Sequence, residues 1–227
     1  MGAYPKRNMN VSSGLRQTTY RHVDDALVVA DKPAGLLAVP GRGPDKADCL
    51  AARVQAEFSD ALIVHRLDMD TSGLMLMARG PDAQRTLSHA FASRAVHKRY
   101  VAWVAGRMTL PELEWGTVEL PLICDWPNRP LQKVDHELGK PSVTRWRVLD
   151  YDAARDATRV ELEPVTGRSH QLRVHMRELG HPMLGDPLYA PAAVRARAPR
   201  LLLHAAALEI PHPVTGAACV FESPPPF

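Results

Sequence analysis

Residues 65–73 read His65-Arg66-Leu67-Asp68-Met69-Asp70-Thr71-Ser72-Gly73 and connect two apolar segments, residues 62–65 and 74–78. Both apolar segments have the length of short β-strands, and both are bounded by turn-forming residues. A polar link between buried strands places its side chains at the edge of a sheet, where a cleft can reach them. On its own, an aspartate in such a link is more often a solvated turn residue than a catalytic group.

The rest of the chain predicts an α+β fold with a mainly antiparallel sheet. Segments rich in Val, Leu and aromatic residues, bounded by Gly, Pro and Asp, are expected as strands at residues 27–30, 62–65, 74–78, 99–104, 143–149, 159–162 and 207–210. Helices are expected at residues 47–58, at 81–94 with Pro81 in the first turn, and at 169–179 with Ser169 as the cap and Gly180 after the end. Because strands and helices do not alternate strictly, a parallel α/β sheet is not favoured.

Length and composition predict one domain. The 227 residues are 45% apolar, which suffices for a single domain over residues 21–227, built of two closely joined subdomains. Residues 1–20 are polar and lack periodicity, so we expect a flexible arm there. The proline-containing stretch 120–141 is expected to be a long loop.

Charge and cysteine usage restrict the function only loosely. A net charge of +3 suits contact with a polyanion but is common among soluble enzymes. Cys49, Cys124 and Cys219 are too far apart for a disulfide framework or a zinc cluster, which favours a reducing cytoplasm. The apolar runs are too short to span a bilayer and no signal peptide is recognised, so we expect a cytoplasmic protein with no membrane partner.

A second polar segment reads Thr166-Gly167-Arg168-Ser169-His170-Gln171-Leu172-Arg173-Val174-His175. Leu172, Met176 and Leu179 follow helical spacing and are expected to form the buried stripe. Gln171, Arg173 and His175 are then expected elsewhere on the helix. Arg168 then precedes the helix and can reach sideways. The histidines of this segment are expected to make ordinary hydrogen bonds near the core, because no third ligand is spaced for a metal.

These two segments, with residues 31–36 and 202–205, resemble the RluA family of pseudouridine synthases, and the resemblance runs in the family's order from about residue 27 to the end. It implies the pseudouridine synthase fold, in which helices and loops flank a mainly antiparallel mixed sheet with a central catalytic cleft. The implied activity isomerises uridine to pseudouridine within RNA, without a cofactor. Residues 121–130 resemble a short subgroup that lacks the N-terminal S4 domain and acts on 23S rRNA and tRNA.

The resemblance also assigns three catalytic residues. Asp68 matches the family's catalytic aspartate, which attacks the sugar or the base or supports loss of a ribose proton. Arg168 is matched to the active-site arginine, whose guanidinium lowers the pKa of a nearby carboxylate by about 1–3 units. Tyr100 matches the active-site tyrosine, which stacks on the uracil and can assist proton transfer.

Further residues are expected to bind the RNA. The target uridine must leave its stack, at a cost of about a few kcal/mol, and Arg66 matches the position proposed to fill the gap. His65, Leu172, Arg129 and Lys98 are expected to contact the substrate as well. We expect no metal site and no obligate protein partner, and we expect a monomer. Asp70 is assigned a structural role.

Other functions remain open at this stage. Residues 68–71 also spell the D-x-D-x-T start of magnesium-dependent phosphatases, but His65 and Arg66 interrupt the strand that such a motif requires. A glycosidase would use Asp68 and Asp70, yet residues two apart rarely adopt opposed geometry. A non-catalytic RNA-binding module with chaperone-like action is the third alternative, and it predicts that Asp68→Asn leaves function intact.

Overall fold

The computed structural model describes residues 18–41, 43, 46–109 and 114–227. The helices are α1 (Leu50–Glu57), α2 (Pro81–Ala92), α3 (Gln171–Glu178), the short α4 (Ala192–Arg195) and a 3-10 turn, η2 (Trp126–Asn128). The strands are β1 (Thr19–Val23), β2 (Leu27–Lys32), β3 (Ala61–Ile63), β4 (Ser72–Arg79), β5 (His97–Ala105), β6 (Gly116–Glu119), β7 (Leu122–Cys124), β8 (Gln132–Val134), β9 (Val143–Asp152), β10 (Ala157–Pro164), β11 (Leu203–Pro211) and β12 (Ala218–Glu222).

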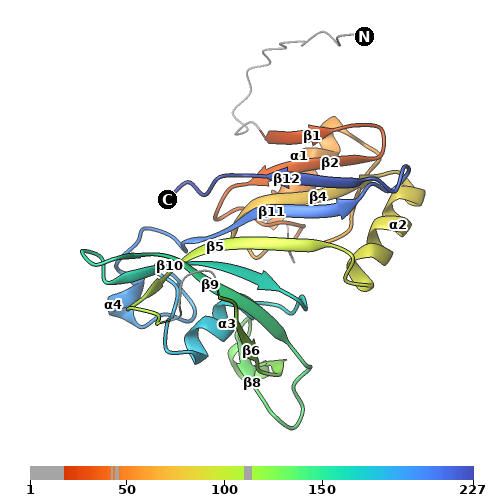
Figure 1. The fold of residues 1–227 in the computed structure, drawn as a ribbon. Helices are drawn as coiled ribbons and strands as arrows, with labels where there is room; N and C mark the ends of the chain where they lie inside the picture. Colours follow the sequence, from red (N-terminus) through yellow and green to blue (C-terminus); the bar gives the residue numbers. More distant parts are fainter. Residues whose placement is uncertain (1–17, 42, 44–45, 110–113) are drawn as a thin grey trace.

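One mixed sheet runs through the whole molecule (Figure 1). In the part of the chain that the structure describes it has ten strands, in the order β1-β2-β4-β11-β5-β10-β9-β6, with β12 paired to β11 and β3 paired to β4. The β4–β11 pair is parallel and the other described pairs are antiparallel. The predicted α+β class with a mainly antiparallel mixed sheet is therefore confirmed.

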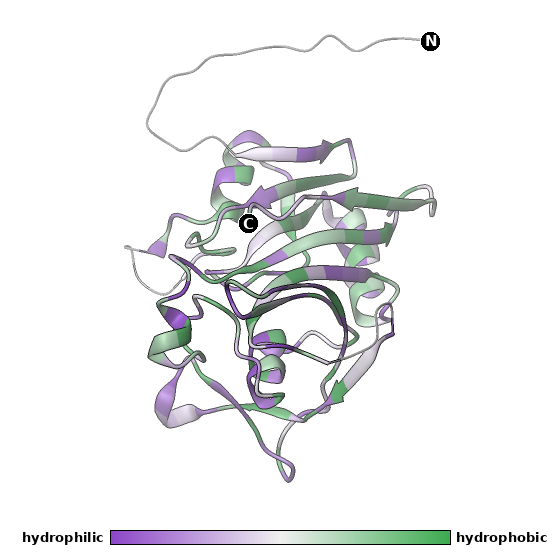
Figure 2. Ribbon diagram, turned by 60° about the vertical axis from the view of Figure 1, so that its left-hand side comes forward, coloured by the Kyte–Doolittle hydropathy of each residue, from purple (hydrophilic) through white to green (hydrophobic). Residues whose placement is uncertain are grey.

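Strand β2 is buried on both faces because a helix covers each of them. Val28 and Ala30 belong to the apolar cluster that contains α1, whereas Leu27 and Val29 belong to the cluster that contains α2. This alternation follows from the period of two along a strand. Figure 2 shows hydrophobic residues gathered along these central strands.

A separate apolar cluster lies in the other half of the sheet, between β5, β10 and α3. Leu172 and Met176 of α3 are buried in it, as the helical spacing predicts. Tyr100 of β5 packs against both this cluster and the α1 cluster. Its ring therefore lies where the two halves of the molecule meet.

The predicted bounds of three segments need correction. The expected arm lies outside the described residues up to residue 17, while Thr19 and Tyr20 already belong to strand β1. Helix α3 begins at Gln171 and not at Ser169, because His170 adopts the left-handed conformation (φ 54°) and no side chain caps the helix. The stretch 120–141 contains the β7–β8 hairpin as well as loops.

Candidate active site

Asp68 lies in the link between β3 and β4, and two contacts from the β2 side hold this link. The carbonyl oxygen of Met69 accepts a hydrogen bond from the backbone N–H of Gly35 (2.9 Å) and another from Lys32 Nζ (2.8 Å). The N–H of Thr71 donates to the carbonyl oxygen of Asp68 (3.2 Å), which closes a turn. The backbone around Asp68 is thereby attached to the core of the sheet.

Lys32 is fully buried and its ammonium group has only carbonyl partners in the described structure. Besides Met69, it donates to the carbonyl oxygens of Pro33 (3.0 Å) and Leu36 (2.8 Å). Burial lowers the pKa of Lys32 to about 8, although the charges of Asp70 and Asp68 oppose this shift. Three donors meet three acceptors, so this lysine joins the residue 31–36 segment to the Asp68 link.

The end of this link comes close to β11. Gly73 has φ 109°, and a Cβ atom placed on it would overlap the backbone oxygen of Ala205 on the parallel neighbour strand. Glycine is required here because no other residue allows both the positive φ and the close approach. The close packing places the Asp68 link directly beside β11 and β5.

A cleft of about 540 Å³ opens over Asp68, within the volume range of ligand pockets. Asp68 lines this cleft, and its side chain is 26% exposed. The cleft is lined by seven of the predicted site residues: His65, Arg66, Asp68, Lys98, Tyr100, Arg168 and Leu172. The eighth, Arg129, is not among its lining residues; it lies at the β7–β8 hairpin, with its guanidinium 4.2 Å from the ring centroid of Trp126.

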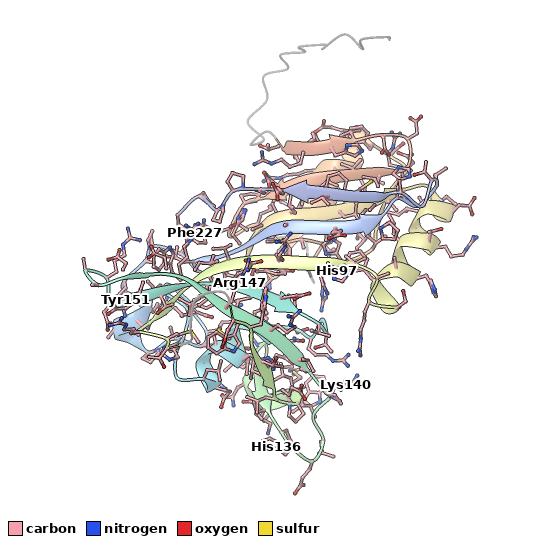
Figure 3. The ribbon with its side chains drawn as sticks, viewed as in Figure 1. His97, His136, Lys140, Arg147, Tyr151 and Phe227 are labelled. Atoms are coloured by element: carbon pink, nitrogen blue, oxygen red, sulfur yellow. The ribbon has the colours of Figure 1, made fainter. Side chains whose placement is uncertain are left out.

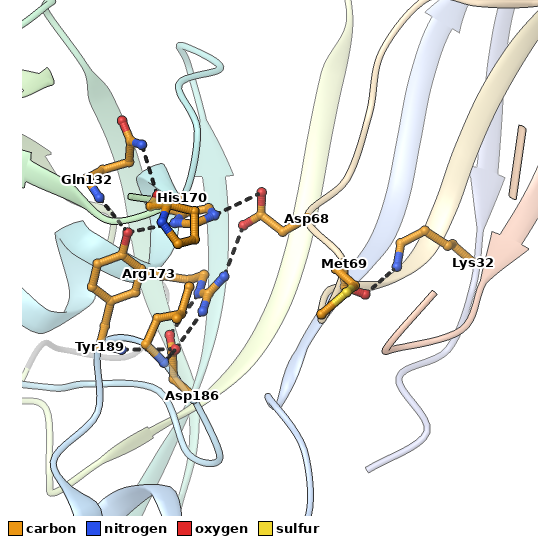
Figure 4. A network of polar contacts seen from close by, with 10 residues as sticks. Lys32, Asp68, Met69, Gln132, His170, Arg173, Asp186 and Tyr189 are labelled. Atoms are coloured by element: carbon orange, nitrogen blue, oxygen red, sulfur yellow. Dashed lines mark hydrogen bonds and ion pairs between the residues drawn. The ribbon is translucent and has the colours of Figure 1, made fainter. Parts of the chain in front are cut away.

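The cation beside Asp68 is Arg173 and not Arg168 (Figure 4). Arg173 Nη1 lies 3.4 Å from Asp68 Oδ2, while its Nε and Nη2 donate to the two carboxylate oxygens of Asp186 at 2.8 and 2.6 Å. The guanidinium of Arg168 lies instead 3.4 Å from the carbonyl oxygen of Pro141. The predicted pairing of Arg168 with Asp68 is therefore wrong.

Arg173 is almost completely buried, with 2% of its side chain exposed. Burial lowers the pKa of this guanidinium, but the hydrogen bonds to Asp186 and the charges of Asp186 and Asp68 raise it above the ordinary value. An arginine remains charged in proteins even without such help. Asp68 consequently faces a permanent, immobile positive charge.

Tyr100 and Lys98 project from β5 toward the cleft, because side chains two apart lie on one face of a strand. Arg99 points to the opposite face, where it lies 3.6 Å from Glu161. Burial and the nearby charge of Asp68 raise the pKa of Tyr100, so its phenol is neutral. Burial also lowers the pKa of Lys98.

His65 has a structural partner. Its Nε2 accepts a hydrogen bond from the backbone N–H of Leu76 (2.9 Å), and its ring stacks on Phe91 at 4.7 Å. Burial lowers the pKa of His65 to about 3. The ring is therefore neutral near pH 7 and attaches the link to β4. Arg66, by contrast, is exposed at the cleft.

The surroundings of α3 differ from the prediction, because Gln171, Arg173 and His175 are all buried. His175 makes ordinary hydrogen-bond contacts near the core, to Thr144 Oγ1 (2.9 Å) and the carbonyl oxygen of Leu120 (3.1 Å), as predicted. His170 also has such a contact, to Tyr189, but its Nε2 in addition lies 3.9 Å from Asp68 Oδ1.

Sequence reasoning missed the closeness of His170 to Asp68 and the partners Asp186 and Tyr189. The Nδ1 of His170 lies 2.6 Å from the Tyr189 hydroxyl oxygen. The sequence does hold one signal for His170, which lies between two arginines in the same polar segment as Arg173. Asp186 and Tyr189 lie in the segment after α3, and no local sequence pattern indicates that they come close to Asp68.

Two features are absent from the part of the chain that the structure describes. The described residues contain no group of three or more His, Cys, Asp and Glu side chains placed to hold a metal ion. They also contain no helix long and apolar enough to cross a membrane.

The arrangement suits chemistry on a single planar ring. One carboxylate that lines the cleft lies 3.4 Å from a fixed guanidinium, and a carboxylate is the kind of group that nucleophilic attack or proton abstraction needs. A neutral aromatic ring beside it offers a surface for stacking.

Comparison with known proteins supports this interpretation. Residues 26–178 match the family model described as RNA pseudouridylate synthase. The chain belongs to this family. The synthase is 52% identical over 204 residues to the dual-specificity RNA pseudouridine synthase RluA of Escherichia coli K12, covering 90% of this chain and 91% of that protein. It is 48% identical over 206 residues to the RluA of Pasteurella multocida, covering 91% and 92% of the two chains.

Solved structures agree. Human RNA pseudouridylate synthase domain containing 1 superposes on the synthase with a TM-score of 0.78 at 27% identity, covering 96% of this chain and 87% of that one. Human RNA pseudouridylate synthase domain containing 4 has a TM-score of 0.71 at 25% identity, covering 92% and 88%. The chain is an RNA pseudouridine synthase and thus an isomerase. The phosphatase and the non-catalytic RNA-binding alternatives are not favoured.

Proposed function

We propose that the synthase isomerises uridines in stem-loops of two RNA classes, 23S rRNA and tRNA, and that Asp68 is its catalytic carboxylate. The observation that carries the assignment of Asp68 is its contact with Arg173 in the cleft. The reaction breaks the bond from uracil N1 to ribose C1′ and joins C5 to the same carbon. It needs one ionised carboxylate, whether the attack is on the sugar or on the base.

Arg173 takes the role first expected of Arg168. Because its guanidinium is also bound to Asp186, it cannot swing away from Asp68 without breaking two further hydrogen bonds. A preorganised charge needs no rearrangement when the reaction proceeds. Tyr100 stacks on the uracil with its neutral ring, a contact worth about 1–3 kcal/mol per base.

The uridine reaches Asp68 only after leaving its stack, since a base inside a helix cannot enter a cleft. Arg66 is exposed at the cleft, and its flat guanidinium can occupy the vacated space and hydrogen-bond to the RNA. Lys98 and Leu172 line the same cleft and contact the uracil or the RNA backbone next to it. Arg129, with the exposed ring of Trp126, contacts the RNA outside the cleft.

The proposed dual specificity rests on the relatives, and the choice of 23S rRNA and tRNA rests on the subgroup that residues 121–130 resemble. The similar proteins carry the description dual-specificity RNA pseudouridine synthase, and the likeness extends over nine-tenths of both chains. Selection by the folded shape and loop deformability of the RNA, rather than by long sequence, allows one cleft to accept two RNA classes.

Asp68→Asn tests the catalytic assignment. Purified wild type and variant are incubated, in EDTA, with unmodified tRNA and 23S rRNA transcripts, and pseudouridine is mapped by chemical adduct formation and primer extension. We expect wild type to modify both RNAs, and Asp68→Asn to bind them but form no product. Asp82→Asn, an exposed carboxylate on α2, is the matched control and should keep full activity. Product from Asp68→Asn contradicts the catalytic role, and a wild type active on one RNA contradicts dual specificity.

A further inference from the structure

His170 is held in an unusual backbone conformation at the cleft. Its φ of 54° lies in the left-handed region, which non-glycine residues seldom adopt and which occurs preferentially at functional sites. This conformation stops the chain from entering α3 one residue earlier. Only 13% of the side chain is exposed, and its Nε2 faces Asp68 Oδ1 at 3.9 Å.

The tautomer of His170 can be assigned from its neighbours. The Tyr189 hydroxyl oxygen accepts the backbone N–H of Gln132 (2.9 Å), and the described contacts offer its own proton only His170 Nδ1, at 2.6 Å. The Nδ1 atom then accepts a hydrogen bond, so the ring proton of a neutral imidazole is on Nε2. The opposite tautomer would turn a lone pair toward the carboxylate of Asp68.

Burial keeps the imidazole of His170 neutral. Burial and the Arg173 guanidinium lower the pKa of His170, with burial the larger cause, and they outweigh the opposing charges of Asp68, Asp186 and Asp70. Tyr189 is itself fixed, because the Arg173 guanidinium lies 5.1 Å from its ring centroid. Burial raises the pKa of Tyr189 to about 12, which keeps its hydroxyl proton in place.

We propose that His170 is a positioning residue for Asp68, and that its Nε2–H, fixed by the chain of hydrogen bonds from Gln132 through Tyr189, binds one carboxylate oxygen while Arg173 binds the other. This inference rests on the proposed role of Asp68. The present separation exceeds a hydrogen bond by about 1 Å, and catalytic hydrogen bonds often shorten when substrate fills the site.

The same chain of contacts connects the catalytic carboxylate to the β7–β8 hairpin (Figure 4). Gln132 begins β8, three residues after Arg129 on the hairpin that presents Trp126 to solvent. A shift of this hairpin when RNA docks would move the Gln132 N–H, the Tyr189 hydroxyl and the imidazole together.

His170→Gly is the variant of choice, because glycine adopts φ 54° without strain and preserves the start of α3. At saturating tRNA we expect the single-turnover rate to fall by about 10- to 100-fold, as for loss of a hydrogen bond to a charged group, with the RNA Kd and the melting temperature unchanged. Imidazole should restore the rate, since it can accept from Tyr189 and donate to Asp68. 1-Methylimidazole, which has no N–H, should not.

Tyr189→Phe removes only the hydroxyl group and provides a second measure. Tyr189→Phe should also lower the single-turnover rate without changing the RNA Kd. This variant tests the proposal even if neither imidazole nor 1-methylimidazole enters the space that His170→Gly leaves. Tyr151→Phe is the matched control, because Tyr151 lies near the β9–β10 turn (Figure 3), bonds Asp156 and does not line the cleft.

Wild-type rates in both His170→Gly and Tyr189→Phe would overturn the proposal, as would equal rescue by the two azoles or a loss confined to RNA binding. If Asp68→Asn is inactive in the same assay, such a result removes only the role of His170. Product from Asp68→Asn would instead remove the proposed function.

Discussion

Replacement of Arg173 by methionine separates the stabilising and the catalytic roles of the central ion pair. The change keeps a long side chain but leaves the carboxylate of Asp186, only 1% exposed, without its cation. Breaking a buried pair from one side costs about 3–5 kcal/mol. For a chain of this size that corresponds to a melting temperature lower by roughly 6–20 °C. Thermal and urea unfolding measure the loss.

Adding Asp186→Asn should recover most of that stability. The substitution removes the unpaired charge. The asparagine side-chain oxygen can still accept the backbone N–H groups of Leu188 and Tyr189, which lie 2.9 and 3.2 Å from Asp186 Oδ1 in the wild type. The double variant should remain inactive in pseudouridine formation, because Asp68 has still lost its guanidinium. A double variant no more stable than Arg173→Met, or one that regains the wild-type rate, would refute this reasoning.

Two further predictions concern the Asp68 link. Gly73→Ala should lower the free energy of unfolding by more than about 1 kcal/mol, because the new Cβ overlaps the Ala205 backbone. Gly216→Ala is the control and should lower it less, because Gly216 also has a positive φ but has open space around it. Equal losses of the two variants in urea titrations would show that the overlap is unimportant. His65, whose pKa falls from 6.5 to about 3 on folding, binds fewer protons folded than unfolded, so its contribution to stability is complete above pH 6.5 and is lost as the pH falls toward 3. The variant His65→Gln can still accept the Leu76 N–H but does not titrate, so the wild type should lose stability more steeply than this variant over this pH range. Parallel curves of unfolding free energy against pH for the two proteins would contradict the lowered pKa of His65.

Local patterns in the sequence identified most of the central strands. Residues 27–30, 74–78 and 99–104 all lie within observed strands, because runs of Val, Leu and Met between turn residues have few other stable arrangements. Strands β1 and β12 escaped prediction. Both alternate exposed and half-buried residues and pair with a single strand in the described structure, so their hydrophobic signal is weak.

Amphipathic reasoning failed for α3 in an instructive way. It assigned Leu172, Met176 and Leu179 to the buried stripe and placed Arg173 and His175 elsewhere on the helix, with the histidine hydrogen-bonded near the core. In the structure each of these two polar residues has buried partners, Asp186 for the arginine and Thr144 for the histidine. Burial of such groups depends on partners from other segments, which helical spacing does not reveal.

The sequence by itself determined the family, the α+β class and the position of Asp68 in a polar link between two strands, because these depend on short contiguous motifs. Only the tertiary structure decided which arginine faces Asp68. Arg168 and Arg173 are five residues apart, and the left-handed turn at His170 lies between them. Arg173 contacts Asp68, whereas Arg168 contacts Pro141. That choice depends on one backbone torsion and on a buried carboxylate thirteen residues further along the chain.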